Sequence, residues 1–182
     1  KGYDWTPGPN ITWDQYLEIA QWINENVSEV NYGAGHMAKQ WNSIYCDFSS
    51  VFWAFGARGF ENPETESYGV IFPGRCLWDS PEAIEAAKFY KKLITEVAHP
   101  ASVGWDWASL GEAFSKGDEI AMCFNWQDYM MTFDDPIRSK VAGKVEAALM
   151  PKGKDGRSHN YYSGTGLTIS GYLPEERQKA AW

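Results

Sequence analysis

The stretch WASLGEAFSKGDEIAMCFNWQDY, residues 107–129, decides the fold because a helix, an abrupt stop and a short strand follow one another within it. Ser109 opens a Ser-x-x-Glu capping box, which predicts a helix start, and Gly117 suits the left-handed residue that follows a helix end. The apolar run 120–124 then predicts a buried strand. This strand ends close to Trp126, so the sequence raises the question of what a large ring does at a strand end.

Similar local signals predict the other elements of the chain. Thr12 and Gln15 form a second capping box before a helix over 13–27, and residues 31–35 break that helix. Ser80-Pro81 predicts a helix start, and the apolar stripe of this helix, Ala83 to Val97, belongs to the core. Further helices are predicted over 47–57, 126–133 and 173–182, and strands over 145–150 and 167–169. A turn is predicted at Asp155-Gly156 and a hairpin at 68–72. Helices that alternate with few short strands indicate an α/β or α+β class with more helix than sheet.

The composition excludes several classes of partner. The 182 residues fit one domain of ordinary size, and the net charge of −8 disfavours nucleic acid and anionic membrane surfaces. Aromatic residues make up 16% of the chain, and their rings stack on flat apolar faces of ligands. The cysteines are Cys46, Cys76 and Cys123, so at most one disulfide forms. Cys46–Cys76 is the candidate pair, and a buried, free Cys46 is the alternative.

The motifs of common catalytic and cofactor sites do not occur in this sequence. Gly-x-Ser-x-Gly, Gly-Lys-Ser/Thr and Gly-x-Gly-x-x-Gly are all missing, and His36, His99 and His159 lack the spacing of metal ligands. We therefore predict a protein with no catalytic residues, no cofactor and no metal. A carbohydrate hydrolase is the alternative, since it needs two acids roughly 5–10 Å apart across a sugar cleft, and Asp47 and Asp128 are its candidates. A plain protein-interaction module is a third possibility.

Several segments of the chain resemble bacterial extracellular solute-binding proteins of the maltose-binding type. Ala-Phe-Ser-Lys-Gly-Asp-Glu-Ile-Ala-Met at 113–122 is similar to a phrase of that family in which Ala-Phe, Gly and Ala-Met recur in order. The other matching segments, in chain order, are Thr-Trp-Asp at 12–14, the helix at 80–94, the segment 139–151 and the glycine-containing strand at 164–170. The resemblance spans nearly the whole chain, and it depends on the order of the segments because each one alone is short.

The resemblance implies a fold and a partner set. The fold is then α/β, a single lobe of the type II periplasmic-binding-protein-like fold, helix-rich around a small mixed sheet. Residues 1–11 are an arm or hinge remnant, and 12–182 form the second, C-terminal lobe of a two-lobe protein, truncated at both ends. Such a protein binds a solute, here a carbohydrate, and delivers it to an ABC permease. The expected place is extracytoplasmic, either periplasmic or tethered to the cell surface as a lipoprotein. The missing N-terminal lobe leaves a face that favours self-association.

Trp126 is the first candidate for a ligand contact. Ligands of open α/β sheets sit beyond the strand ends, so this ring is expected at a cleft rim, where it stacks on a sugar. Asn125 and Asp128 are expected to bond sugar hydroxyls beside it. The alternative is that Trp126 covers the core under the next helix.

The resemblance supplies the remaining candidate residues. For Tyr45 and Trp41 the alternative is packing under a loop. For the segment that contains Gly164 the alternative is a bulge or turn glycine, whereas the resemblance implies a glycine that lets the backbone approach a ligand. These candidates are Tyr45, Asp47 and Trp41 near the start of the second helix, and Tyr161, Tyr162 and Gly164 before the glycine-containing strand.

Overall fold

The computed structural model describes residues 11–61, 74–161 and 169–181. Two short parallel strands form its centre, β1 (Tyr32–Gly35) and β2 (Ile120–Cys123), with Ala34 opposite Met122. Ala34 also forms a parallel bridge with Ala98, which extends the sheet on the other side of β1. The segment 31–35 was predicted only as a helix break, and that prediction was incomplete because most of it is a buried strand.

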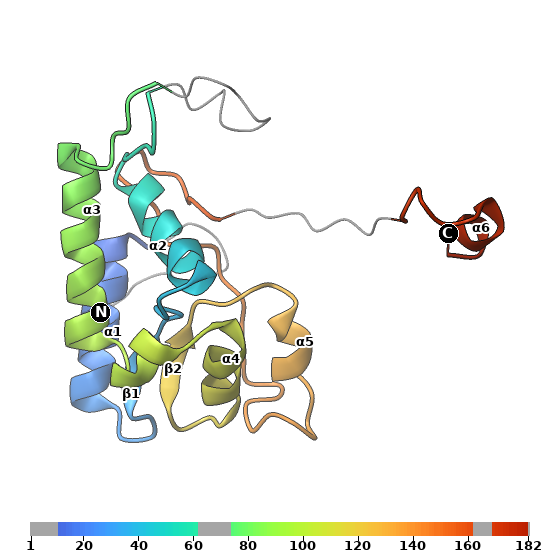
Figure 1. Cartoon of the computed structure of the whole chain (residues 1–182). Helices are drawn as coiled ribbons and strands as arrows, with labels where there is room; N and C mark the ends of the chain where they lie inside the picture. Colours follow the sequence, from blue (N-terminus) through green and yellow to red (C-terminus); the bar gives the residue numbers. More distant parts are fainter. Residues whose placement is uncertain (1–10, 62–73, 162–168, 182) are drawn as a thin grey trace.

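The helices α1 (Trp13–Asn26) and α3 (Pro81–Lys92) lie along one flank of the molecule (Figure 1), where the rings of Trp13 and Phe89 are 6.2 Å apart. Both begin where the sequence predicts. Thr12 and Gln15 form the capping box of α1, and the Ser80 side chain accepts from the backbone N–H of Ala83 in α3. The helix α3 continues into a π-helical turn, η2 (Leu93–Val97).

The first core cluster joins these two helices to α2 (Asn42–Ala54), which starts earlier than the predicted residue 47. Most of the predicted stripe of α3 and η2 is buried, which confirms its assignment to the core, although Ala87 is exposed. The buried residues of this cluster include Trp13, Tyr16, Phe52, Ala86, Tyr90 and Leu93.

The second core cluster lies beside β2 and fills the space under α4 (Trp107–Ser115) and α5 (Tyr129–Phe133). A 3-10 helix, η3 (Pro100–Gly104), precedes α4. The predicted cap at Ser109 was wrong: Asp106 is the N-cap, and its carboxylate accepts from the backbone N–H of Ser109. Gly117 has a φ of 83°, as predicted for the residue after a helix end.

The C-terminal part of the described chain contains less regular structure than predicted. Residues 145–150 form no strand, although Lys152 bridges to Thr12 and to Ser158, around a turn that includes Gly156. The last helix is α6 (Glu175–Ala181), and none of its residues is buried. The predicted hairpin at 68–72 and the strand at 167–169 lie wholly or largely outside the described residues.

The cysteines test the predicted disulfide, and the helices test for a membrane span. All three cysteines are free, so the candidate Cys46–Cys76 disulfide is not formed, and Cys46 is buried as in the alternative. Among the described residues, no helix has the length and apolar character needed to cross a membrane.

Candidate ligand-binding site

The carboxyl ends of β1 and β2 lie at the same edge of the sheet because the strands are parallel. Beyond Gly35 the chain leads to Trp41 and the start of α2, and beyond Cys123 it leads to Asn125 and Trp126. Ligands of open α/β sheets bind at this edge. The predicted residues that follow the two strands are therefore brought to the part of the fold where a ligand site is expected.

Tyr161 is the centre of a cluster of aromatic rings at this edge. Its ring centroid lies 5.6 Å from that of Tyr45, edge to face, and 5.7 Å from that of Trp126. Trp53 is almost parallel to it, at 6.4 Å and an interplanar angle of 2°. The backbone N–H of Tyr161 donates to Ser50 Oγ at 3.3 Å, which fixes this segment against α2. The cluster therefore joins three segments that are far apart in the sequence.

A second pair of rings stands next to the cluster. Trp41, at the start of α2, and Trp107, at the start of α4, lie 5.9 Å apart. Asn125 links the two groups, since its amide donates to the carbonyl of Trp107 at 2.9 Å and accepts from the backbone N–H of Trp126 at 2.8 Å. We call the six rings the aromatic rim: Trp41, Tyr45, Trp53, Trp107, Trp126 and Tyr161.

The aromatic rim is accessible to a ligand. Trp41 is 66% exposed and Tyr45 is 46% exposed, whereas Trp126 and Tyr161 are half-buried. Large exposed rings that gather in one place mark an interaction site more often than isolated surface rings do. Half-buried rings that are held by neighbours also lose little conformational freedom when a ligand stacks on them. The rim thus offers fixed apolar faces at the edge of the sheet.

An ion pair lies next to Trp107. Lys39 Nζ is 3.0 Å from Asp106 Oδ2. The bond from the backbone N–H of Ser109 is the main reason that the pKa of Asp106 falls to about 2, and the bond from Lys39 adds to it. The carboxylate therefore stays ionised and paired at neutral pH. Because its charge is already matched by Lys39, this part of the rim suits a neutral ligand better than an ionic one.

Asp128 belongs to a depression that no ring of the aromatic rim lines. This depression, of about 620 Å³, lies between α4 and α5, and Glu112, Lys116, Tyr129 and Arg138 are among its other lining residues. The walls carry both signs of charge. Among the predicted site residues that the structure describes, only Asp128 lines this depression. We take the aromatic rim rather than the depression as the candidate sugar site, because ring faces recognise the apolar faces of a pyranose.

Asp47 does not join the aromatic rim. It is 1% exposed, and its carboxyl group accepts from the Tyr90 hydroxyl at 2.8 Å and contacts His36 at 3.1 Å. The structure therefore brings together Trp41, Tyr45, Asn125, Trp126 and Tyr161 from the predicted set. The predicted residues Tyr162 and Gly164 lie outside the described residues.

Two members of the rim, Trp53 and Trp107, were not predicted. Trp53 follows Tyr45 by eight residues on α2, a spacing that keeps both rings within one broad stripe of a helix, so this signal was available in the sequence. Trp107 was overlooked because the start of α4 was placed at Ser109. No group of three or more His, Cys, Asp or Glu side chains suited to a metal ion occurs in the described ranges.

Comparison with known proteins identifies the class to which this fold belongs. The profile of the bacterial extracellular solute-binding protein family matches residues 3–182, and the chain belongs to this family. A solute-binding protein of an ABC transporter from Agrobacterium radiobacter, solved with ribitol, is 24% identical, with a TM-score of 0.78 over 94% of this chain. Maltose-bound MalE3 of T. maritima is 25% identical, with a TM-score of 0.74 over 99% of this chain.

A curated relative agrees with this class. The probable ABC transporter-binding protein of Deinococcus radiodurans is 22% identical over 175 residues, which are 94% of this chain. The chain spans only about two fifths of the length of these relatives: 39% of the Deinococcus protein, 40% of the ribitol-bound protein and 42% of the maltose-bound protein. The predicted family and the predicted fold, a helix-rich single lobe around a small sheet, are confirmed.

Proposed function

We propose that this chain is the second, C-terminal lobe of a two-lobe solute-binding protein, and that it captures a sugar or polyol for an ABC importer. Residues 1–11 would be the hinge-side arm, and the other lobe would close over the aromatic rim and bury the ligand. The loaded protein would then deliver the solute to a membrane permease outside the cytoplasm, either in the periplasm or from a lipoprotein tether. Without the other lobe, the exposed rim would favour self-association.

One observation carries this proposal: the aromatic rim stands at the carboxyl edge of both parallel strands. A neutral sugar or polyol has the matching chemistry, since its C–H faces pack on rings and its hydroxyls bond to nearby polar groups. The similar solved structures carry ribitol and maltose, both neutral and rich in hydroxyls. A third, 25% identical protein from Agrobacterium vitis carries D-mannitol, with a TM-score of 0.67 over 82% of this chain.

The hydrolase alternative has less support. It would need Asp47 and Asp128 to face one another across a cleft. Asp47 is 1% exposed and bonded within the core, whereas Asp128 is an exposed residue at the α4–α5 depression. A sugar could therefore reach only one of the two acids. A transport protein without catalytic activity fits this arrangement and the family.

The test is a thermal-shift screen of the full-length protein with maltose, ribitol, D-mannitol and D-tagatose. A ligand that binds only the native state stabilises it, by about 2.7 kcal/mol at a hundred times its Kd. We expect at least one of these compounds to raise Tm in a concentration-dependent way. If none does, while the protein unfolds cooperatively and reversibly, the proposed sugar site is rejected.

Substitution of Trp126 tests whether the aromatic rim is the site. Trp126→Ala removes one stacking face and should weaken the binding of the active sugar by about 1–3 kcal/mol, or about 5–150-fold in Kd. Trp22→Ala is the matched control, because Trp22 is 48% exposed but lies on α1, which contributes no ring to the rim. Equal Kd values for the Trp126 variant and the wild type, measured by calorimetric titration, would contradict the assignment.

A further inference from the structure

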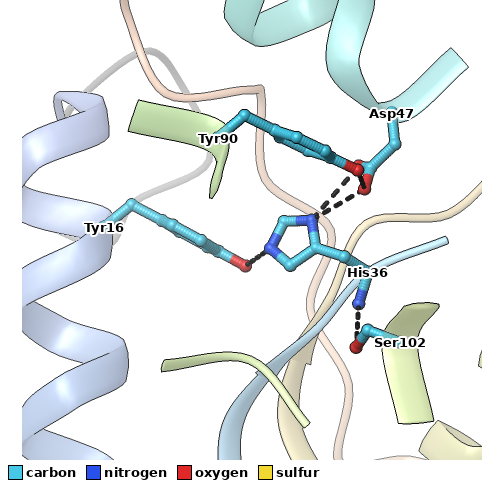
Figure 2. A network of polar contacts seen from close by, with 5 residues as sticks. All are labelled: Tyr16, His36, Asp47, Tyr90 and Ser102. Carbon is cyan, nitrogen blue, oxygen red and sulfur yellow. Dashed lines mark hydrogen bonds and ion pairs between the residues drawn. The ribbon is translucent and has the colours of Figure 1, made fainter. Parts of the chain in front are cut away.

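A polar network lies within the core beneath α2 (Figure 2). His36 Nδ1 is 3.2 and 3.1 Å from the two carboxyl oxygens of Asp47, and the Tyr90 hydroxyl donates to Asp47 Oδ2 at 2.8 Å. The Tyr16 hydroxyl is 3.3 Å from His36 Nε2, and the backbone N–H of His36 donates to Ser102 Oγ at 3.2 Å. His36 is 0% exposed, so this network is shielded from solvent.

Every polar side-chain atom of the pair His36 and Asp47 has a partner. Both ring nitrogens of His36 and both carboxyl oxygens of Asp47 are within hydrogen-bond distance of another group. The pair therefore avoids the large penalty of burying unpaired polar groups. Burial, with the charge of Asp47 adding to it, raises the pKa of Tyr16 and of Tyr90 above the ordinary value, so both hydroxyls stay protonated. The network joins α1, the end of β1, α2 and α3.

The start of α2 needs such an anchor. Its N-cap is Trp41, whose side chain makes no capping bond, and its first turn contains no acidic residue. The face that this part of the helix buries is polar, and Ser43 Oγ has no partner among the described residues. Asp47 is thus the residue that bonds this half of the helix to the core. Tyr45, which packs on Tyr161, lies only two residues before it.

We propose that Asp47, held by His36 and Tyr90, is a positioning residue of the sugar site, which fixes the start of α2 and so places Tyr45 against Tyr161. This inference rests on the proposed function only for its effect on binding. It assigns Asp47 a role without ligand contact, and it explains why an acidic residue of the predicted site lies in the core. Loss of the anchor should release the first turns of α2 while the rest of the lobe stays folded.

The cysteines of the chain report such a release directly. Cys46, next to Asp47, is 2% exposed, Cys123 lies on β2, and Cys76 is exposed. Burial raises the pKa of Cys46, which a bond from Tyr161 partly opposes, and burial raises the pKa of Cys123 to about 12. Both thiols should react slowly with a maleimide in the wild type. Peptide mass spectrometry gives a separate labelling rate for each cysteine, with Cys76 as the reference for reagent reactivity.

The experiment compares Asp47→Ala, Asp47→Asn and the control Asp118→Ala in the full-length protein. The asparagine keeps the shape of Asp47 and can still bond to Tyr90 and His36. Both Asp47 variants remove its charge, which itself raises the pKa of Cys46, so the difference between them isolates the lost bonds. We expect Asp47→Ala to raise the ratio of Cys46 to Cys123 labelling about tenfold, and Asp47→Asn to stay within about threefold of wild type.

The second measurement is the Kd of whichever of maltose, ribitol, D-mannitol and D-tagatose gives the largest thermal shift. It should rise about tenfold in Asp47→Ala and be largely restored in Asp47→Asn. If Asp47→Ala does not fold, Tyr90→Phe replaces it, because this variant removes one bond to Asp47 and keeps its charge. Its ratio of Cys46 to Cys123 labelling should then rise about threefold.

The outcomes separate this inference from the proposed function. An equal increase in Cys46 and Cys123 labelling would mean global destabilisation and would overturn the inference, as would an unchanged ratio in the alanine and phenylalanine variants. A selective increase at Cys46, with no sugar bound by the wild type, would support the anchor and reject the sugar site. A selective increase with unchanged sugar Kd would overturn the proposed effect on binding.

Discussion

Asp106 gives the sharpest test of the forces that hold α4 in place. Its carboxylate accepts from the backbone N–H and the hydroxyl of Ser109, each at 3.0 Å, and it pairs with Lys39 at 3.0 Å. Two substitutions separate these contributions. Asp106→Asn keeps an N-cap oxygen but removes the charge, and Asp106→Ala removes both. We expect the alanine variant to lose more stability than the asparagine variant.

The size of the effect follows from the pKa of Asp106. Its ordinary value of 3.8 falls to about 2 in the folded protein. That difference of about 1.8 corresponds to a ceiling of about 2.4 kcal/mol, at about 1.36 kcal/mol per pKa unit. The Lys39 side chain is 46% exposed and that of Asp106 is 21% exposed, so solvent screening reduces the expected charge contribution to about 1 kcal/mol. Loss of the cap in Asp106→Ala costs about 0.5–2 kcal/mol in similar helices.

The sign of the pH dependence follows from linkage. A carboxyl group whose pKa is lowered by folding stabilises the protein above its unfolded pKa, and this contribution is lost as the pH falls towards the folded value. The wild type should therefore exceed Asp106→Asn in free energy of unfolding by about 1 kcal/mol at pH 7. The excess should shrink between about pH 4 and pH 2.

Urea unfolding at a series of pH values measures this difference. Asp118→Asn, on an exposed turn, serves as the control for a general change in charge. A difference between the wild type and Asp106→Asn that stays constant from pH 7 to the lowest pH at which both proteins fold would contradict the role of the charge. Equal stability of Asp106→Ala and the wild type at neutral pH would contradict the role of the cap.

Two further predictions concern the packing of the core. Gly33→Ala should lower the free energy of unfolding by an amount near the upper end of about 1–3 kcal/mol, because a Cβ there would meet backbone atoms of Ala20, including Cα at 2.7 Å. Gly104→Ala is the control, since a Cβ there has nothing within 4 Å, and it should have little effect in the same urea titration. Leu93→Ala should lower the free energy of unfolding by about 2–5 kcal/mol, since Leu93 is 0% exposed. Ile84→Ala, on the exposed face of α3, should lower it far less. Similar Tm values for these two variants would contradict the core assignment.

The helices that were predicted well are those whose signals are local. Thr12 with Gln15 and Ser80 with Pro81 satisfy backbone groups within one turn, so the same contacts form whatever surrounds the helix. The start of α4 was misplaced because two capping residues compete there. Asp106 prevails over Ser109 since it also pairs with Lys39, a residue 67 positions away whose proximity the sequence does not reveal.

The strands show the limit of local patterns more clearly. The segment Tyr-Gly-Ala-Gly of β1 has no β-branched residue and reads as a break, yet it is buried because Gly33 lets the strand approach the backbone of α1. Residues 145–150 have an apolar pattern but find no neighbouring strand among the described residues. Strand formation depends on a partner, and a partner is a property of the fold rather than of the segment.

The site was predictable in part for the same reason. Trp126 could be placed at the edge because a strand end precedes it directly. Its neighbour Tyr161 was suggested by the resemblance. Tyr161 lies at the centre of the cluster because its backbone N–H bonds to Ser50 and so holds it against α2, a contact that the sequence does not reveal. Asp47 was placed with the ligand because the resemblance puts it in the turn before the second helix, where the family contacts its ligand. Its burial depends on His36 and Tyr90, which reach it from two other elements.

The helix α2 reverses the usual arrangement of an amphipathic helix, and this reversal links the site to the core. Its first half exposes Trp41 and Tyr45 while it buries Ser43 and Asp47. Stability alone favours the opposite choice, because exposed rings forgo the gain of burial and buried polar groups require partners. The chain supplies those partners through His36 and Tyr90, and so it can keep rings on the outside of a well-fixed helix. Local departures of this kind are expected where a surface is selected for binding rather than for stability.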